Sequence, residues 1–190
     1  MRRADIDHII GAAANVTGEQ EFVIIGSQAI LGNQVDDPPA DLLESMEADI
    51  YPSRAPEKAD LIDVSLGDGS RFHETFGYYA HGVGPETAKA PAGWENRLIE
   101  VPIAPRLGSS TESTALFMEM HDIVLSKCVA GRDRDWDYAR EAMRHGLVTL
   151  EGLRAGIPML PIPEPDQQRI EAMLEALARQ AAAPPERPQV

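Results

Sequence analysis

Two carboxylates stand two positions apart in a stretch whose alternation is typical of a β-strand. In SMEADIYP, Glu47 and Asp49 alternate with apolar residues, namely Met46, Ala48 and Ile50. Residues i and i+2 of a strand point to one face, so the carboxylates should project together while the apolar residues face the core. Paired carboxylates are ligands for Mg²⁺, which bridges nucleotide phosphates in phosphoryl transfer. The alternative interpretation is a strand with a solvated acidic face.

A glycine and a serine end a buried strand earlier in the chain. The apolar run EFVIIG finishes at Gly26, and Ser27 opens SQAILGN, which we expect to start a helix. Glycine lets the backbone turn tightly, and exposed amides at the helix start, with the serine hydroxyl as an extra donor, make an anion site that suits a triphosphate. An ordinary strand-to-helix turn with Ser27 as the N-cap is the other interpretation.

A third cluster mixes charges of both signs in the stretch SKCVAGRDRDWDYAREAMRHG. Its basic residues and aspartates follow one another closely: Lys127, Arg132, Asp133, Arg134, Asp135 and Asp137. Such a mixture suits a site that contacts phosphate and moves protons. On a continuous helix Lys127 and Asp135 would share a face, and a bend at Gly131 would still let them line one cleft. A solvated helix with i to i+4 ion pairs is the alternative.

The elements that must position these residues alternate between strand and helix patterns. Helices are expected at 3–16, 56–66, 119–130, 134–145, 149–155 and 164–182, and strands at 21–26, 45–52 and 97–104. The aromatic segment 71–95 is expected to hold a strand or two plus loop, with its rings in the core. Residues 32–44 begin as a loop and recover helical spacing near their end. These patterns predict an α/β (α+β) domain with a helical C-terminal half.

Composition limits the classes of protein. With 190 residues, 43% of them hydrophobic, the chain can bury one good core. The N-terminal stretch does not resemble a signal peptide, no run approaches a membrane span, and the single cysteine cannot form an internal disulfide. A cytoplasmic protein is therefore expected. The formal charge of −14 repels polyanions unless basic residues are concentrated locally. The five histidines show no metal-ligand spacing.

In combination, these motifs resemble the nucleotidyltransferase superfamily of the DNA polymerase β type. SMEADIYP, FHETFGYYAHGVGPETA and HDIVLSKCVAGRDRDWDYAREAMRHGLV are similar to a family of small bacterial minimal nucleotidyltransferases related to the AbiEii and MenT toxins. The resemblance runs from about residue 21 to residue 148. It implies a nucleotidyltransferase core with a small mixed sheet flanked by helices in 1–105. It also implies a helical part in 106–182 that completes the active-site cleft; residues 183–190 are expected to be a disordered tail.

The resemblance also implies roles for individual residues. Gly26 and Ser27 match the phosphate-binding turn, and Glu47 and Asp49 match the acids that bind Mg²⁺. The implied reaction begins with attack by an acceptor hydroxyl on the α-phosphorus of a nucleoside triphosphate, and pyrophosphate leaves.

Three positions of the charged cluster match the family as well. Lys127 matches the lysine that contacts the nucleotide, while Arg132 and Asp135 match the basic and acidic positions that follow it. Asp135 either activates the acceptor or positions Lys127.

Three departures from the superfamily pattern bear on the metal site. The first acid is Glu47, where the superfamily usually has aspartate, and the interval between Ser27 and Glu47 is long enough to require an insertion or a lid. The nearest candidate for a third carboxylate is Glu100, which could equally be an exposed strand residue.

Two functional hypotheses follow. The first is a Mg²⁺-dependent nucleotidyltransferase, with a toxin of a toxin-antitoxin pair as an open possibility and a cognate antitoxin as its partner. Related toxins modify tRNA, but the net charge disfavours RNA unless six residues form a basic face: Lys127, Arg132, Arg134, Arg140, Arg144 and Arg154. A protein or small-molecule acceptor stays open. The second hypothesis is a catalytically weak nucleotide- or partner-binding protein that keeps the fold, and solvated acids without a ligand are the third interpretation.

Overall fold

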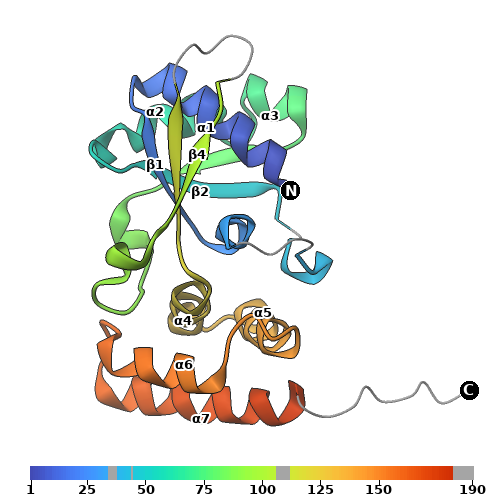
Figure 1. Cartoon of the computed structure of the whole chain (residues 1–190), viewed down its shortest axis with the longest axis vertical. Helices are drawn as coiled ribbons and strands as arrows, with labels where there is room; N and C mark the ends of the chain where they lie inside the picture. The colour runs from blue at the N-terminus through green and yellow to red at the C-terminus, as the bar shows by residue number, and fades with distance from the viewer. Residues whose placement is uncertain (34–37, 44, 106–111, 182–190) are drawn as a thin grey trace, which may run out of the picture.

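A five-stranded mixed sheet with the strand order β3-β2-β1-β5-β4 forms one end of the molecule (Figure 1). The computed structural model describes residues 1–33, 38–43, 45–105 and 112–181. The strands are β1 (Glu21–Ile25), β2 (Glu47–Pro52), β3 (Tyr79–Gly82), β4 (Ile99–Ile103) and β5 (Ser113–Phe117). β1 pairs with β2 in antiparallel and with β5 in parallel orientation, β2 pairs in parallel with β3, and β4 is antiparallel to β5. The predicted fold class is confirmed.

β1 lies in the centre of the sheet, which explains its continuous apolar run. Phe22 and Ile24 are fully buried, and Val23 and Ile25 on the other face are almost as inaccessible. A central strand covered on both faces needs apolar residues at every position, whereas β2 alternates only in its first half. The end of β1 at Gly26 is therefore the point where the chain leaves the core.

The helices divide between the two ends of the molecule. Three of them accompany the sheet: α1 (Arg3–Thr17), α2 (Ala59–Leu66) and α3 (Arg71–Phe76). Four gather at the other end (Figure 1): α4 (Met120–Ala130), α5 (Asp133–Arg144), α6 (Leu150–Gly156) and α7 (Glu164–Ala181). Short 3-10 helices connect them: η1 (Ser27–Gly32), η2 (Ala40–Leu42), η3 (Pro56–Lys58), η4 (Pro85–Thr87), η5 (Trp94–Arg97) and η6 (Ile157–Met159).

Two predicted helix boundaries coincide with glycines in the left-handed region. α1 ends at Gly18, with φ of 73°, and the bend between α4 and α5 lies at Gly131, with φ of 67°. Side chains with a Cβ rarely adopt this conformation, so glycine is the residue that stops a helix this way. The predicted pair of helices hinged at Gly131 is confirmed.

Several local expectations are corrected. The aromatic segment begins with α3 before the strand β3, and SQAILGN forms a 3-10 helix rather than the start of an α-helix. Met46 precedes β2 and is 57% exposed, so the expectation that it faces the core is wrong. Phe72 and Tyr78 pack against the core, but Phe76 is exposed at its edge.

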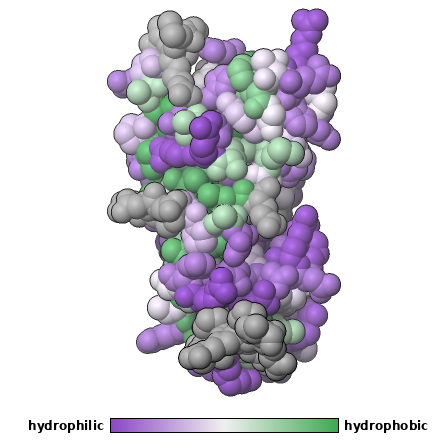
Figure 2. Space-filling model, turned by 90° about the vertical axis from the view of Figure 1, so that its right-hand side faces the viewer, coloured by the Kyte–Doolittle hydropathy of each residue, from purple (hydrophilic) through white to green (hydrophobic). Residues whose placement is uncertain are grey.

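β5 was not expected and joins the two halves of the chain. It belongs to the segment assigned to the helical part, yet it lies in the sheet between β1 and β4. Hydrophobic residues gather near the middle of the face in Figure 2, while most of the coloured residues visible at the helical end are hydrophilic. The tail 183–190 and residues 34–37 of the expected loop lie outside the described residues. Within the described chain, no helix is both long and apolar enough to cross a bilayer.

Candidate active site

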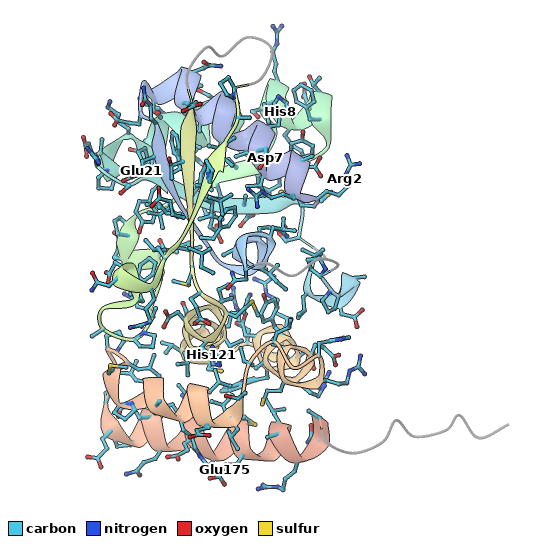
Figure 3. All side chains as sticks on the ribbon, in the orientation of Figure 1. Arg2, Asp7, His8, Glu21, His121 and Glu175 are labelled. Carbon is cyan, nitrogen blue, oxygen red and sulfur yellow. The ribbon has the colours of Figure 1, made fainter. Side chains whose placement is uncertain are left out.

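A cavity of about 700 Å³ separates the end of the sheet from α4 and α5. Its walls come from β1, β2 and β3, from the segments around η2 and η4, and from the two helices: Ile25, Gly26, Ser27, Asp41, Leu42, Ser45, Glu47, Asp49, His81, Thr87, Ala88, Lys89, Ser126, Lys127, Val129, Ala130, Arg132, Arg134 and Tyr138. Side chains from both ends of the molecule fill the region around it (Figure 3). Its volume lies in the range of pockets that hold small molecules.

Gly26 shapes the wall of the cavity at the end of β1. Its φ of 70° and ψ of −160° suit only a residue without a side chain, and a Cβ built there would lie 2.7 Å from Oδ2 of Asp49. Because Gly26 has no side chain, its backbone can lie close to the Asp49 carboxylate. Ser27 follows at once and lines the same cavity.

Glu47 and Asp49 both line the cavity, and each has a partner on the neighbouring strand. In the parallel register of β2 and β3, Glu47 lies opposite Tyr79 and Asp49 lies opposite His81. The Tyr79 hydroxyl donates a hydrogen bond of 2.7 Å to Oε2 of Glu47. Nδ1 of His81 lies 3.0 Å from Oδ1 of Asp49 and 3.6 Å from Oε1 of Glu47. Asp49 thus has His81 as its direct partner, and Glu47 is held by Tyr79 and lies close to the same histidine.

The surroundings of Glu47 and Asp49 disfavour a negative charge on both side chains at once. Burial, and then the charge of Glu47, raise the pKa of Asp49 above its ordinary value, although His81 partly opposes this. The hydrogen bond to Glu47 is the largest cause that raises the pKa of Tyr79 to about 12, so this hydroxyl remains a donor. A cation bound between the carboxylates would relieve the repulsion, since it favours the ionised form of both.

Lys127 stands on the helical side of the cavity. Its Nζ lies 4.6 Å from the centre of the Tyr138 ring and 3.6 Å from Oδ1 of Asp135. Burial lowers the pKa of Lys127, and the charge of Asp135 offsets part of this shift. The ammonium group is therefore held between an aromatic face and a carboxylate, with its position fixed by both.

Asp135 lies behind Lys127 and does not line the cavity. Its side chain is fully buried, and it accepts hydrogen bonds from the backbone N–H of Arg132 at 3.2 Å and from Nε of Arg132 at 2.7 Å. Burial alone would raise the pKa of Asp135, but the hydrogen bonds from Arg132 and the charge of Lys127 lower it overall. Asp135 is thus an ionised anchor for both basic residues.

The structure separates the candidate third carboxylate from this group. Glu100 is exposed on β4, and β4 and β3 are the opposite edge strands of the sheet. The residue that completes a cluster with Glu47 and Asp49 is His81: within the described chain these three have ligand atoms within 4.8 Å of one another. Sequence reasoning missed His81. The spacing of Tyr79 and His81 repeats that of the two acids, but the pairing of the two strands was needed to connect them.

The basic face that RNA binding would require is only partly present. Of its six residues, Lys127, Arg132 and Arg134 line the cavity. The other three are paired with acidic side chains, Arg140 with Asp137 and Glu141, Arg144 with Glu141 and Asp41, and Arg154 with Glu171 and Glu175. Lys89, which was not predicted, adds a positive charge to the cavity wall near η4. Positive charge is therefore concentrated at the cavity in an acidic protein.

A comparison with protein-family models assigns the chain to a family. The model of the DUF6036 family, described as a nucleotidyltransferase of unknown function, matches residues 4–173. No curated protein and no solved structure matches the chain significantly. The matched range includes every residue that lines the cavity and all five strands. The chain belongs to the DUF6036 family of nucleotidyltransferases.

Proposed function

We propose that the protein transfers a nucleoside monophosphate from a nucleoside triphosphate to an acceptor hydroxyl, with a divalent cation such as Mg²⁺ in the cavity. The observation that carries the proposal is the arrangement of charge: Glu47 and Asp49 line the sheet side of the cavity, and Lys127 and Arg132 line the helical side. A nucleotidyltransferase needs both, because a metal-bound triphosphate presents a cation to the acids and anionic oxygens to the basic residues.

The residues present fit a divalent cation. Glu47 and Asp49 offer carboxylate oxygens from the same face of one strand, and the pKa of Asp49, raised first by burial and then by Glu47, shows that His81 does not fully compensate the negative charge there. Gly26 leaves room beside Asp49 that any larger residue would fill. The bound cation would bridge the phosphates and neutralise charge as the leaving group departs.

In this proposal, the phosphates of the nucleotide contact residues other than the two acids. Ser27 supplies a hydroxyl at the turn, and Lys127 and Arg132 supply charged donors. Asp135 is a positioning residue, since it is buried beneath both and cannot reach a ligand in the cavity. The acceptor oxygen then bonds to the α-phosphorus, the bond from that phosphorus to its bridging oxygen breaks, and pyrophosphate leaves.

Two classes of acceptor are to be tested. The resemblance to the AbiEii and MenT toxins makes tRNA the first acceptor to test, and such a toxin would have a cognate antitoxin. Lys89 and Arg134, which line the cavity on different segments, are suited to contact the phosphates of an RNA end. The net charge of −14 confines any such contact to the cavity, and a protein hydroxyl is the alternative acceptor.

A label-transfer experiment tests the proposal. The protein is incubated with each of four α-labelled nucleoside triphosphates and either Mg²⁺ or Mn²⁺, together with total tRNA, cell protein or no added acceptor. We expect a labelled product from the wild type and none from Asp49→Asn, while Glu100→Gln, which changes an exposed carboxylate away from the cavity, should behave as wild type. Blank lanes with every donor and acceptor would contradict the proposed activity.

A further inference from the structure

His81 is a site residue that the carboxylate pair alone does not account for. Its side chain is half-exposed and lines the cavity, whereas His8 and His121 contact residues elsewhere. Nδ1 of His8 lies 2.8 Å from the Tyr78 hydroxyl, and Nδ1 of His121 lies 2.8 Å from Oε1 of Glu119. Figure 3 shows His8 on α1 and His121 at α4, in different parts of the molecule.

The distance from His81 to Asp49 matches that between two ligands of one metal ion, and the distance from His81 to Glu47 is slightly longer. Two ligand atoms that each lie about 2.1 Å from an ion, at angles of about 90–110°, are about 3.0–3.4 Å apart. Nδ1 of His81 lies 3.0 Å from the nearest oxygen of Asp49 and 3.6 Å from that of Glu47. Small adjustments of half-exposed side chains would bring all three atoms around one ion.

A second observation indicates that the same cavity takes a polar ligand. Tyr138 lines it and is only 6% exposed, and its hydroxyl has no hydrogen-bond partner among the described residues. A buried hydroxyl without a partner costs free energy, so a ligand that supplies one is expected. This observation is independent of the acids and of His81.

We infer that His81 is a metal ligand beside Glu47 and Asp49 and that it makes the site select a first-row transition-metal ion over Mg²⁺. The inference rests on the proposed function for the role of the metal. Mg²⁺ is a hard cation that takes oxygen ligands and tolerates nitrogen poorly, whereas ions from Mn²⁺ to Zn²⁺ accept imidazole together with carboxylates. A site of three carboxylates would have a weaker preference, and His81 is the third member of the cluster here.

The preference is measured with Mn²⁺ as the probe and Mg²⁺ as the competitor. Free Mn²⁺ is quantified by electron paramagnetic resonance in the presence of the full chain, without nucleotide. We expect the wild type to bind Mn²⁺ at least about tenfold more tightly than Mg²⁺, and His81→Gln to lose at least about tenfold in Mn²⁺ affinity with little change for Mg²⁺. His145→Gln, which removes an exposed imidazole outside the cavity, is the matched control.

A second substitution at His81 should shift the metal preference in the opposite direction. His81→Asp would convert the site to three carboxylates, and we expect it to gain Mg²⁺ affinity relative to Mn²⁺. Equal ratios of Mn²⁺ to Mg²⁺ affinity in the wild type, His81→Gln and His81→Asp would overturn the inference.

A spectroscopic signature identifies the ligand directly and requires no variant. The electron spin echo of bound Mn²⁺ should carry modulation from a coordinated ¹⁴N nucleus, and this modulation should change when the chain is labelled with ¹⁵N-histidine. Bound Mn²⁺ without nitrogen modulation would overturn the assignment of His81. Nitrogen modulation without any label transfer would support the ligand and contradict the proposed activity. Label transfer without nitrogen modulation would contradict the ligand alone.

Discussion

At the scale of single residues, the site depends on a glycine and two acids that are costly for stability. Gly26 adopts a backbone conformation that other residues avoid, and Asp49 faces Glu47 in a partly buried corner. Such local strain persists where the surrounding structure enforces it, and it is concentrated at functional sites. Two predictions distinguish the effect of Gly26 and Asp49 on stability from their role in metal binding.

Substitution Gly26→Ala should damage the site beyond its effect on stability. The positive φ alone costs about 1–2 kcal/mol for a residue with a Cβ, and this Cβ would also push against Oδ2 of Asp49. Gly77→Ala is the control, because Gly77 has φ of 76° but open space around it. Gly26→Ala should lose more stability than Gly77→Ala in urea unfolding, and only Gly26→Ala should lose Mn²⁺ binding. Equal metal binding in both would contradict the proposed contact with Asp49.

Substitution Asp49→Asn should stabilise the metal-free protein. The pKa of Asp49 is raised in the folded state, by burial and then by Glu47, so its ionised form at pH 7 opposes folding. Removing the charge should therefore raise the melting temperature without metal by a few degrees, roughly 2–4 °C for about 1 kcal/mol. The variant should also lose the further rise that metal gives the wild type. A lower melting temperature in EDTA, with Glu100→Gln unchanged, would speak against the repulsion.

At the scale of elements, β2 and β3 present the acids, and the junction of α4 and α5 presents the basic residues. Asp135 is the link between the two helices, since it lies in the first turn of α5 and accepts from Arg132 while it pairs with Lys127 on α4. A buried carboxylate held by two cations stabilises only while it is ionised. The junction should therefore depend on pH.

The free energy of unfolding should fall in acid partly because of Asp135. Its pKa is lowered in the folded state, where Arg132 and Lys127 overcome the effect of burial. Its contribution is fully present above the unfolded pKa of about 4 and is lost as pH falls through the lower folded value. Asp135→Asn should cost about 2–3 kcal/mol at pH 7 and flatten this pH dependence. Asp137→Asn, at an exposed pair with Arg140, should change stability by less than about 1 kcal/mol.

The elements also show what the sequence could reveal and what it could not. The alternation in β2, the apolar run of β1 and the glycine at residue 131 are local patterns, and the elements they predict are present. β5 was missed because its five residues mix small and apolar types after a polar stretch. His81 was missed because its place beside Asp49 arises from strand pairing, which the sequence does not display.

At the scale of the whole molecule, the candidate active-site cavity lies between two parts that share one sheet. β5 comes from the C-terminal segment but pairs with β1 and β4, so the sheet cannot form fully without it. α4 begins close to the end of β5, and α5 packs against α7. The sheet and the helices should therefore unfold together, as small domains usually do.

Two tryptophans test this cooperativity. Trp94 is buried in η5, which directly precedes β4 in the chain, and Trp136 lies on α5. In Trp136→Phe and in Trp94→Phe, the fluorescence of the remaining tryptophan should follow the same urea transition as the far-ultraviolet circular dichroism of that variant. If fluorescence of Trp136 changed in a separate transition, the helical end would be an independent folding unit, and the cavity would lie between two domains.

The most direct test of the central claim compares two positions of the label in the same donor. With the donor and acceptor identified by the transfer screen, α-labelled and γ-labelled nucleoside triphosphate are offered to the wild type, Asp49→Asn, Lys127→Met and Glu100→Gln. The account predicts that only the α-label reaches the acceptor, that Glu100→Gln matches the wild type, and that the two cavity variants lose about 10²-fold or more in rate. Transfer of the γ-label, or α-label transfer at an unchanged rate in Asp49→Asn, would contradict it.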